Sequence, residues 1–263
     1  MTTAICALSK TTKTDSTAKL PLVSIITATF NAYDDLPRTI KSIREMTYRN
    51  IEWIIVDGAS TDRTVELIRD SEDVINCWLS EPDSGIYDAW NKGLRLAQGS
   101  WIAFLGAGDA YTPNGLDTYI RAIQHTSITP DLVSSRVRLL NAERMPLRVW
   151  GGAFEWDEFK KRMTIAHVGA LHHCSIFDKY GNFNTNLVSS ADYEFLLRCG
   201  SQLVTLYLNE ITVERTVGGI SDGYKGMLET YYIQRMYGAC IPATFRFLFA
   251  CAKRIIRPIL RGY

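Results

Sequence analysis

The feature of this chain that most constrains its fold is a series of short apolar runs, each followed by a segment with helical spacing. Three such runs are residues 22–30, 51–56 and 101–105. Runs of this length and composition predict buried strands. Because these strands alternate with helices, the sequence predicts an α/β fold with a mostly parallel central sheet.

Polar residues and glycines follow several of these strands. The segments in question are residues 29–31, Asp57 and residues 106–109. In a parallel sheet, ligands bind beyond the carboxyl ends of the strands. We therefore expect these residues to line one crevice.

The composition of the chain narrows the possible functions. A formal net charge of +1 over 263 residues gives no global field that would favour nucleic acid as a partner. The six cysteines form no C-x-x-C pair, so we expect no zinc site and interpret them as reduced thiols of a cytoplasmic protein. No signal peptide or membrane-spanning run of about 20 apolar residues is expected.

Five stretches, in this order, resemble those of the family 2 glycosyltransferases, which are inverting enzymes of the GT-A fold. They are Val23 to Asn31, Ile55 to Asp62, Ser80 to Gly93, Phe104 to Asp109, and Ser190 to Arg198. A sixth stretch, Gly218 to Ser221, resembles one in members that assemble polysaccharides. The resemblance covers roughly residues 21–225.

This resemblance implies a GT-A-type, Rossmann-like α/β fold with C-terminal helices. It also implies transfer of a hexose-like sugar, with inversion, from a UDP- or GDP-sugar onto a hydroxyl of a saccharide or lipid-linked acceptor. The chain would then divide into a mobile tail (1–20), a nucleotide-sugar-binding half (21–112), an acceptor-binding half (113–222) and a C-terminal helical region (223–263).

Asp109 is the candidate metal ligand. The resemblance implies that it is the last residue of a D-x-D signature that binds Mg²⁺ or Mn²⁺, which neutralises the diphosphate of the donor. Ala107 and Gly108 stand where a further acid is common, so one protein carboxylate would hold the metal. The alternative is that Asp109 is only a turn residue.

The resemblance implies that Thr29, Asn31 and Asp57 line the nucleotide pocket. Gly58 replaces a second acid that many members have, which leaves the nucleobase open. For Asp62 we favour an ordinary role in turn and cap hydrogen bonds.

Three further side chains are candidates for substrate binding. Asp83 would face sugar or ribose hydroxyls, although a solvated turn explains it equally well. Lys92 would reach a phosphate, although an exposed helical lysine is the commoner case. His167 resembles a histidine near the acceptor in related enzymes, and a satisfied core histidine is the alternative.

Asp192 is the candidate general base, which would accept the proton of the acceptor hydroxyl during attack on C1. It lies where a helix is expected to begin, so an acid that favours the helix dipole is the alternative. Glu194 fits that alternative better.

The C-terminal residues 245–261 have an amphipathic pattern at helical spacing. Arg246, Lys253, Arg254, Arg257 and Arg261 share one arc, and apolar residues occupy the rest. This pattern favours peripheral attachment of residues 244–263 to the cytoplasmic face of a membrane. A helix that packs on the catalytic domain is the alternative, and Pro258 would kink it.

Two other functions make different demands on the sequence. A non-catalytic nucleotide- or carbohydrate-binding module would explain the reduced metal signature and the glycine at position 58. A dehydrogenase would need G-x-G-x-x-G after the first strand, and Thr27 to Ala32 contains no glycine. A P-loop is also absent from the sequence.

Overall fold

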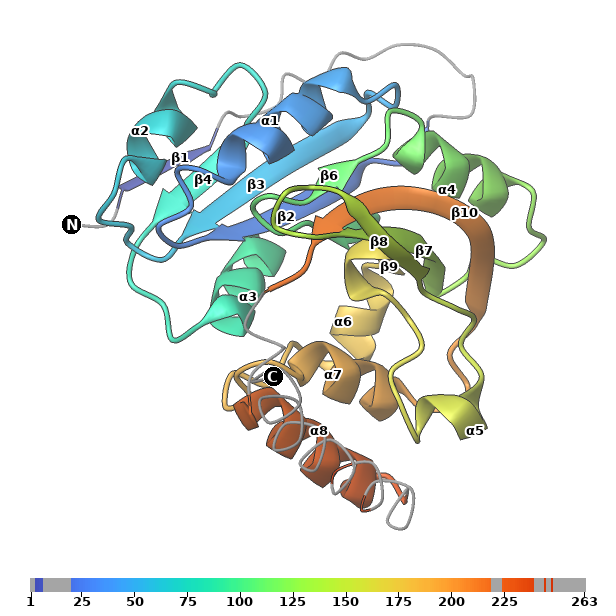
Figure 1. Cartoon of the computed structure of the whole chain (residues 1–263). Helices are drawn as coiled ribbons and strands as arrows, with labels where there is room; N and C mark the ends of the chain where they lie inside the picture. Colours follow the sequence, from blue (N-terminus) through green and yellow to red (C-terminus); the bar gives the residue numbers. More distant parts are fainter. Residues whose placement is uncertain (1–2, 7–19, 219–223, 239–243, 245–246, 248–263) are drawn as a thin grey trace.

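The computed structural model describes residues 3–6, 20–218 and 224–238, together with Thr244 and Phe247. Its first half follows the expected alternation (Figure 1). The elements are β2 (Val23–Thr29), α1 (Leu36–Glu45), β3 (Ile51–Asp57), α2 (Thr64–Arg69), β4 (Cys77–Ser80), α3 (Ile86–Leu96) and β5 (Trp101–Phe104). The predicted strands and helices of this half are therefore confirmed within a few residues.

The second half adds shorter strands and more helices. They are β6 (Ala110–Tyr111), α4 (Gly115–Gln124), β7 (Leu132–Leu140), β8 (Pro146–Trp150), α5 (Trp156–Phe159), the 3₁₀ helix η1 (His167–Gly169), β9 (Ala170–His173), α6 (Ser175–Tyr180), α7 (Ala191–Cys199), β10 (Thr205–Thr216) and α8 (Tyr224–Met236). Strand β10, with 12 residues, is the longest strand of this half.

One sheet runs through both halves. Its strand order is β1-β4-β3-β2-β5-β9-β7-β10-β6, and β8 pairs with β7. The β4-β3-β2-β5 part is parallel, as expected for an α/β fold. Strand β9 runs antiparallel to both β5 and β7, and it joins the two halves. The domain boundary at residue 112 stays a prediction.

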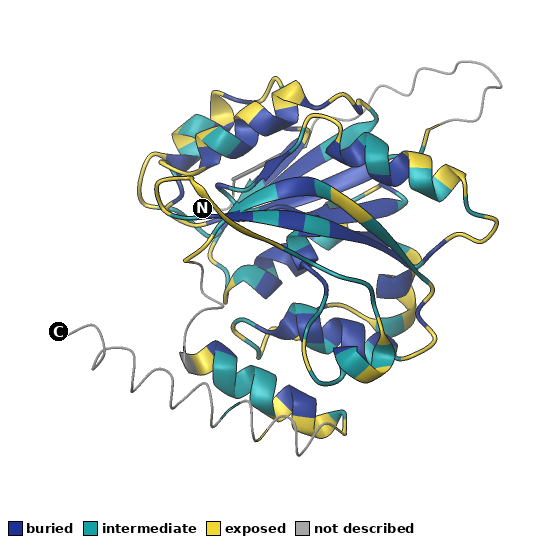
Figure 2. Ribbon diagram, turned by 45° about the vertical axis from the view of Figure 1, so that its right-hand side comes forward, coloured by how far each residue is buried: buried dark blue, intermediate teal, exposed yellow. Residues whose placement is uncertain are grey.

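Both faces of the sheet are apolar and covered by helices. Val23 and Ile25 of β2 pack in one core with α1, α2 and α4, whereas Ile26 packs in a second core with α3, α6 and α7. Figure 2 shows the strands buried and the exposed residues on the outer sides of the helices. Burial on both faces explains why β2 reads as a continuous apolar run instead of an alternating one.

The N-terminal segment departs from the expectation. Within the predicted mobile tail, β1 (Thr3–Cys6) pairs antiparallel with β4. Cys77, in β4, is disulfide-bonded, so the prediction that all six cysteines are reduced thiols is wrong at this position. Scattered spacing could not reveal this, because a disulfide depends on which strands lie side by side.

The C-terminal segment lies mostly outside the described residues. Of residues 244–263, which the sequence assigns to membrane contact, only Thr244 and Phe247 are described. The ring of Phe247 stacks on Tyr231 of α8, with ring centroids 4.8 Å apart. In the part of the chain that the structure describes, no helix is long and apolar enough to cross a membrane.

Candidate active site

The buried carboxylate of Asp57 ties together the ends of three neighbouring strands. It accepts hydrogen bonds from the Thr29 hydroxyl (3.0 Å) at the end of β2, the Ser60 amide (2.9 Å) and the Ser80 hydroxyl (2.7 Å) at the end of β4. Asp57 is fully buried. The structure thus brings Thr29 and Asp57 together, and Asp57 fixes the shape of this end of the sheet.

Asn31 connects the loops that follow β2 and β3. Its backbone is left-handed (φ 48°), and its side-chain oxygen accepts a hydrogen bond from the Thr61 amide (2.9 Å). Its own amide donates to the Ser60 hydroxyl (2.8 Å). Next to it, Asp62 accepts a hydrogen bond from the Thr64 amide (2.9 Å) just before α2, which confirms its role in turn hydrogen bonds.

The carboxylate of Asp83 lies over Gly58. One of its oxygens accepts a hydrogen bond from the Gly85 amide (2.9 Å). The other oxygen is 2.6 Å from the point that a Cβ at residue 58 would occupy. Burial raises the pKa of Asp83, and the nearby charges of Asp88 and Asp57 raise it further. A side chain at position 58 would therefore displace the carboxylate of Asp83.

Lys92 is buried, in contrast to the exposed lysine that helix statistics favour. Its ammonium group donates a hydrogen bond to the carbonyl of Pro82 (2.7 Å) and forms ion pairs with Glu81 (2.9 Å) and Asp88 (3.8 Å). These contacts brace the loop that carries Asp83. Contact between Lys92 and a phosphate stays a prediction.

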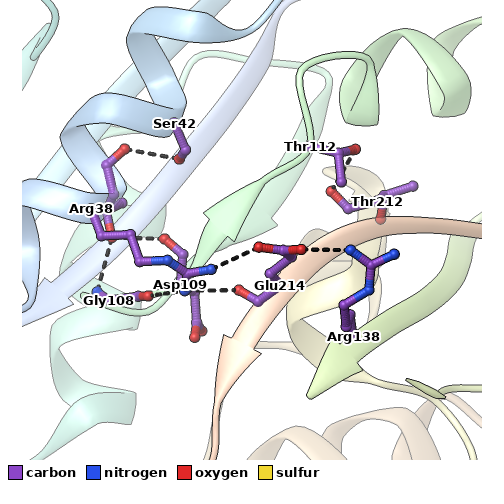
Figure 3. A network of polar contacts seen from close by, with 9 residues as sticks. Arg38, Ser42, Gly108, Asp109, Thr112, Arg138, Thr212 and Glu214 are labelled. Carbon is purple, nitrogen blue, oxygen red and sulfur yellow. Dashed lines mark hydrogen bonds and ion pairs between the residues drawn. The ribbon is translucent and has the colours of Figure 1, made fainter. Parts of the chain in front are cut away.

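Helix α1 holds the backbone of the loop that carries Asp109. The Thr39 hydroxyl donates to the carbonyl of Asp109 (2.8 Å) and accepts from the amide of Gly108 (2.9 Å). The Arg38 guanidinium donates to the carbonyl of Gly108 at 2.6 Å (Figure 3). Gly108 has a φ of +92°, which strongly favours glycine.

The side chain of Asp109 is half-buried. The surrounding protein excludes water from its carboxylate, and this desolvation raises the pKa of Asp109 to about 7. The positive charges of Arg215 and Arg38 oppose this rise. Within the described residues, no group of three or more histidine, cysteine or acidic side chains is arranged to hold a metal. A single carboxylate fits Mg²⁺ or Mn²⁺ only if water and phosphate oxygens supply the other ligands.

Asp192 begins α7 and contacts a residue of α3. Its carboxylate accepts a hydrogen bond from the Tyr87 hydroxyl (3.0 Å), and burial raises its pKa. Glu194, by contrast, forms a two-pronged ion pair with Arg198, with both N–O distances at 3.0 Å. Of the two acids, Asp192 is the one whose environment suits a proton acceptor.

His167 lies in an aromatic cluster next to this site. Its ring stacks on Trp90 (centroids 5.1 Å apart) and on Phe104 (5.3 Å). Its Nε2 atom is buried and has no hydrogen-bond partner among the described residues. Burial, together with the nearby charge of Arg215, lowers the pKa of His167 to about 3, so the ring is neutral. His167 is thus not a fully satisfied core histidine.

Two comparisons decide the family. The family model described as Glycosyl transferase family 2 matches residues 24–178. The PGL/p-HBAD biosynthesis glycosyltransferase of Mycobacterium bovis is 31% identical over 208 residues, which are 77% of this chain and 80% of that protein. The chain belongs to glycosyltransferase family 2. The resemblance carried by the five sequence stretches is therefore confirmed.

Other relatives of this family 2 glycosyltransferase include the putative teichuronic acid biosynthesis glycosyltransferase TuaG of Bacillus subtilis. It is 34% identical over 110 residues, which are 41% of this chain and 44% of TuaG.

Solved structures confirm the GT-A-type α/β fold. S. aureus TarS 1-349 in complex with UDP-GlcNAc has a TM-score of 0.66 at 15% identity, and the match covers 82% of this chain and 65% of that chain. The mannosyltransferase PcManGT from Pyrobaculum calidifontis, in complex with GDP-Man and Mn²⁺, has a TM-score of 0.61 at 17% identity, with 90% and 70% covered.

Sequence reasoning missed three residues that surround the candidate site. Arg38 holds the Asp109 loop, Tyr87 contacts Asp192, and the charge of Arg215 acts on several site residues. Tyr87 lies inside the Ser80 to Gly93 stretch and could have been found there. Arg38 and Arg215 carry no local signal, because their roles depend on contacts between distant segments.

Because His172 is buried and neutral, we expect the wild type to lose stability relative to a variant without this histidine as the pH falls. Burial and the neighbouring His167 hold the pKa of His172 well below its ordinary 6.5. The stability that a neutral buried histidine contributes is present above about pH 6.5 and is lost as the pH falls, by about 1.4 kcal/mol per pH unit. In urea unfolding between pH 6.5 and 4.5, we expect the stability of the wild type relative to His172→Leu to fall at that rate.

The comparison with a variant removes the contribution of Asp109, whose raised pKa acts in the opposite direction. The exposed His125 provides the control, and His125→Gln should show no such trend. A pH-independent difference between the wild type and His172→Leu would contradict this prediction.

Proposed function

We propose that this glycosyltransferase moves a sugar from a nucleotide-diphosphate sugar to an acceptor hydroxyl with inversion. The main support is that two half-buried carboxyl groups, Asp109 and Asp192, have raised pKa values and both lie within the electrostatic influence of Arg215. One carboxylate serves the diphosphate side of the reaction and the other serves the hydroxyl side.

On the diphosphate side, Asp109 would hold Mg²⁺ or Mn²⁺ together with water and phosphate oxygens. The bound cation supplies charge neutralisation for the departing diphosphate. The PcManGT structure, which contains both GDP-Man and Mn²⁺, supports this assignment. Arg38 and Thr39 hold the loop backbone and would thereby fix the position of the Asp109 carboxylate.

On the acceptor side, Asp192 would take the hydroxyl proton as the oxygen attacks C1. Its raised pKa makes it a stronger base than an exposed aspartate. The Tyr87 hydroxyl orients the carboxylate. His167, neutral and with an unpartnered ring nitrogen, is available for a hydroxyl of the acceptor.

The nucleoside part of the donor would lie over the ends of β2, β3 and β4. Thr29, Asn31 and Asp57 shape this region, and Asp83 offers a carboxylate oxygen toward it. UDP-GlcNAc in TarS and GDP-Man in PcManGT leave both UDP- and GDP-sugars as candidate donors.

A methyl group at position 58 tests the role of Asp83. In Gly58→Ala the new Cβ would lie 2.6 Å from the Asp83 carboxylate, so the carboxylate must move. Because hydrogen bonds to a charged group are worth about 1.5–3 kcal/mol, we expect roughly 10–100-fold weaker donor binding, measured by titration calorimetry. Asp83→Ala should give a similar loss.

Gly152→Ala is the matched control, because the nearest atom to its new Cβ is 3.8 Å away. This variant should bind the donor like the wild type. If Gly58→Ala also binds normally, Asp83 does not contact the donor.

The names of the relatives support a role in polysaccharide or glycolipid assembly, with a saccharide or lipid-linked acceptor. A cytoplasmic location with peripheral membrane contact through residues 244–263 belongs to the same proposal. Nothing in the comparisons supports the alternative of a non-catalytic binding module.

A screen of nucleotide-sugars tests the proposed function as a whole. The full chain is incubated with UDP- and GDP-sugars with and without Mn²⁺, and thermal stabilisation and donor hydrolysis are recorded. We expect one nucleotide class to stabilise the protein and to be hydrolysed only with metal. If no nucleotide-sugar does either, the proposal is wrong.

A further inference from the structure

The end of β10 lies beside the segment that carries Asp109. Strand β10 pairs antiparallel with β6, with Val213 opposite Tyr111 and Glu214 opposite Ala110. One step further along this register, Arg215 comes opposite Asp109. Two residues that are 106 positions apart in the sequence thus become neighbours at the end of this strand pair.

Glu214 and Arg215 project to opposite faces of the sheet, because successive side chains of a strand alternate. Glu214 projects toward α1, where its carboxylate pairs with Arg38 (3.0 Å) and with Arg138 (2.8 Å), as Figure 3 shows. Arg215 therefore projects to the opposite face of β10, away from these two ion pairs and on the same side as Val213.

The electrostatic effect of Arg215 on nearby groups agrees with its position beside Asp109. Its guanidinium lowers the pKa of Asp109 more than any other charged side chain does. It also lowers the pKa of Asp192 and of His167. One half-buried cation thus acts on the candidate metal ligand, on the candidate base and on the candidate acceptor residue.

The structure assigns to Arg215 a direct role in the reaction, and we propose that its guanidinium binds the diphosphate of the donor. This inference rests on the proposed function.

In the reaction, the bond between the acceptor oxygen and C1 forms and the bond between C1 and the phosphate oxygen breaks. The electron pair of the broken bond stays on the diphosphate, and the hydroxyl proton goes to Asp192. The planar guanidinium suits the diphosphate oxygens because it donates two parallel hydrogen bonds.

Arg38 is then a positioning residue for both sides of this site. Its guanidinium holds the carbonyl of Gly108 (2.6 Å) and the carboxylate of Glu214 (3.0 Å). It therefore sets the distance between the loop that carries Asp109 and the strand that carries Arg215. Its substitution should weaken the same step as loss of Arg215, with partial rescue in Arg38→Lys.

The test compares diphosphates with monophosphates. UDP, GDP, UMP and GMP are titrated, with Mn²⁺, against the wild type, Arg215→Gln and Arg215→Lys of the full chain. Because charge-assisted bonds to the second phosphate are lost, we expect Arg215→Gln to bind the preferred diphosphate roughly 10–100-fold more weakly, with monophosphate binding changed less than about 3-fold. Arg215→Lys keeps the charge but not the planar geometry, so it should fall in between. With a donor sugar, kcat should fall more than KM rises.

Arg136→Gln is the control, because Arg136 lies on the neighbouring β7 and the one hydrogen bond described for its side chain goes to Asn209. It should bind all four nucleotides like the wild type. Diphosphate binding by Arg215→Gln at the wild-type level would overturn the inference. If Arg215→Gln does not fold, Arg215→Lys decides: weaker diphosphate binding supports the inference, and unchanged binding overturns it.

The proposed function and the inference fail differently. If the wild type binds no nucleotide and hydrolyses no donor, the proposed function fails, and the inference fails with it. If the wild type binds diphosphates and both Arg215 variants do so equally well, only the inference fails.

Discussion

An Asp192→Asn variant is expected to lose roughly 10²–10⁴-fold in kcat, with little change in donor affinity. The amide keeps the shape of the side chain and its contact with the Tyr87 hydroxyl, but it cannot accept a proton. Initial rates with the best donor and acceptor, together with calorimetric titration of the donor, measure the two quantities separately.

Glu194→Gln is the matched control for this variant. Glu194 lies two residues further along α7, but its carboxylate is paired with Arg198. We expect its kcat to stay within a few-fold of the wild type. If Asp192→Asn instead turns over near the wild-type rate, Asp192 is not the base, and Glu155 and Asp157 are the next candidates.

An Asp109→Asn variant is expected to lose metal-dependent turnover, again by roughly 10²–10⁴-fold, because the cation supplies several kcal/mol of charge stabilisation in the transition state. In the wild type, half-saturation by Mn²⁺ should require more metal as the pH falls through about 7. The carboxylate has a pKa of about 7 and must be ionised to bind the cation. Rates measured across Mn²⁺ concentrations at pH 6, 7 and 8 test both statements.

Asp35→Asn provides the comparison for Asp109. Asp35 lies against Gly108 and its charge raises the pKa of Asp109, but it is exposed and is not assigned to the metal. Its removal should leave metal-dependent turnover in place. Full activity of the wild type in excess chelator would show that the reaction needs no metal, and Asp109 would then be a turn residue.

The sequence was sufficient to predict the elements whose burial is nearly complete. Strands β2, β3 and β5 are apolar on both sides because helices cover both faces, so their composition identifies them without any knowledge of their partners. The polar residues that end them, such as Thr29 and Asp57, were expected at one edge for the same reason. This expectation needed only the parallel direction of the strands.

The second half was harder to predict because its strands are shorter or more exposed. Strand β6 has two residues, and residues 146–149 of β8 are exposed along an edge of the sheet. Neither has a periodic apolar pattern. Strand β10 carries no continuous apolar run, since its later residues alternate polar and apolar side chains and include the charged pair Glu214 and Arg215.

In the candidate site, too, residues within short sequence stretches were predictable, whereas contacts between distant segments were not. Asp109 and Asp192 belong to recognisable stretches of sequence, whereas the contact of Arg38 with Glu214 spans 176 residues. No local spacing reports such a contact. The disulfide at Cys77 is a second example, because its formation depends on strand neighbours and not on the spacing of cysteines.

The continuous sheet has a consequence for motion during the catalytic cycle. Strand β9 pairs with β5 on one side and β7 on the other, and β10 returns to pair with β6 beside Asp109. The described parts of the two halves are thus joined by backbone hydrogen bonds within one sheet, so we expect no hinge at which one half could close on the other. We expect the opening and closing that substrate entry requires to take place in the loops beyond the strand ends, while the frame that carries both carboxylates stays rigid.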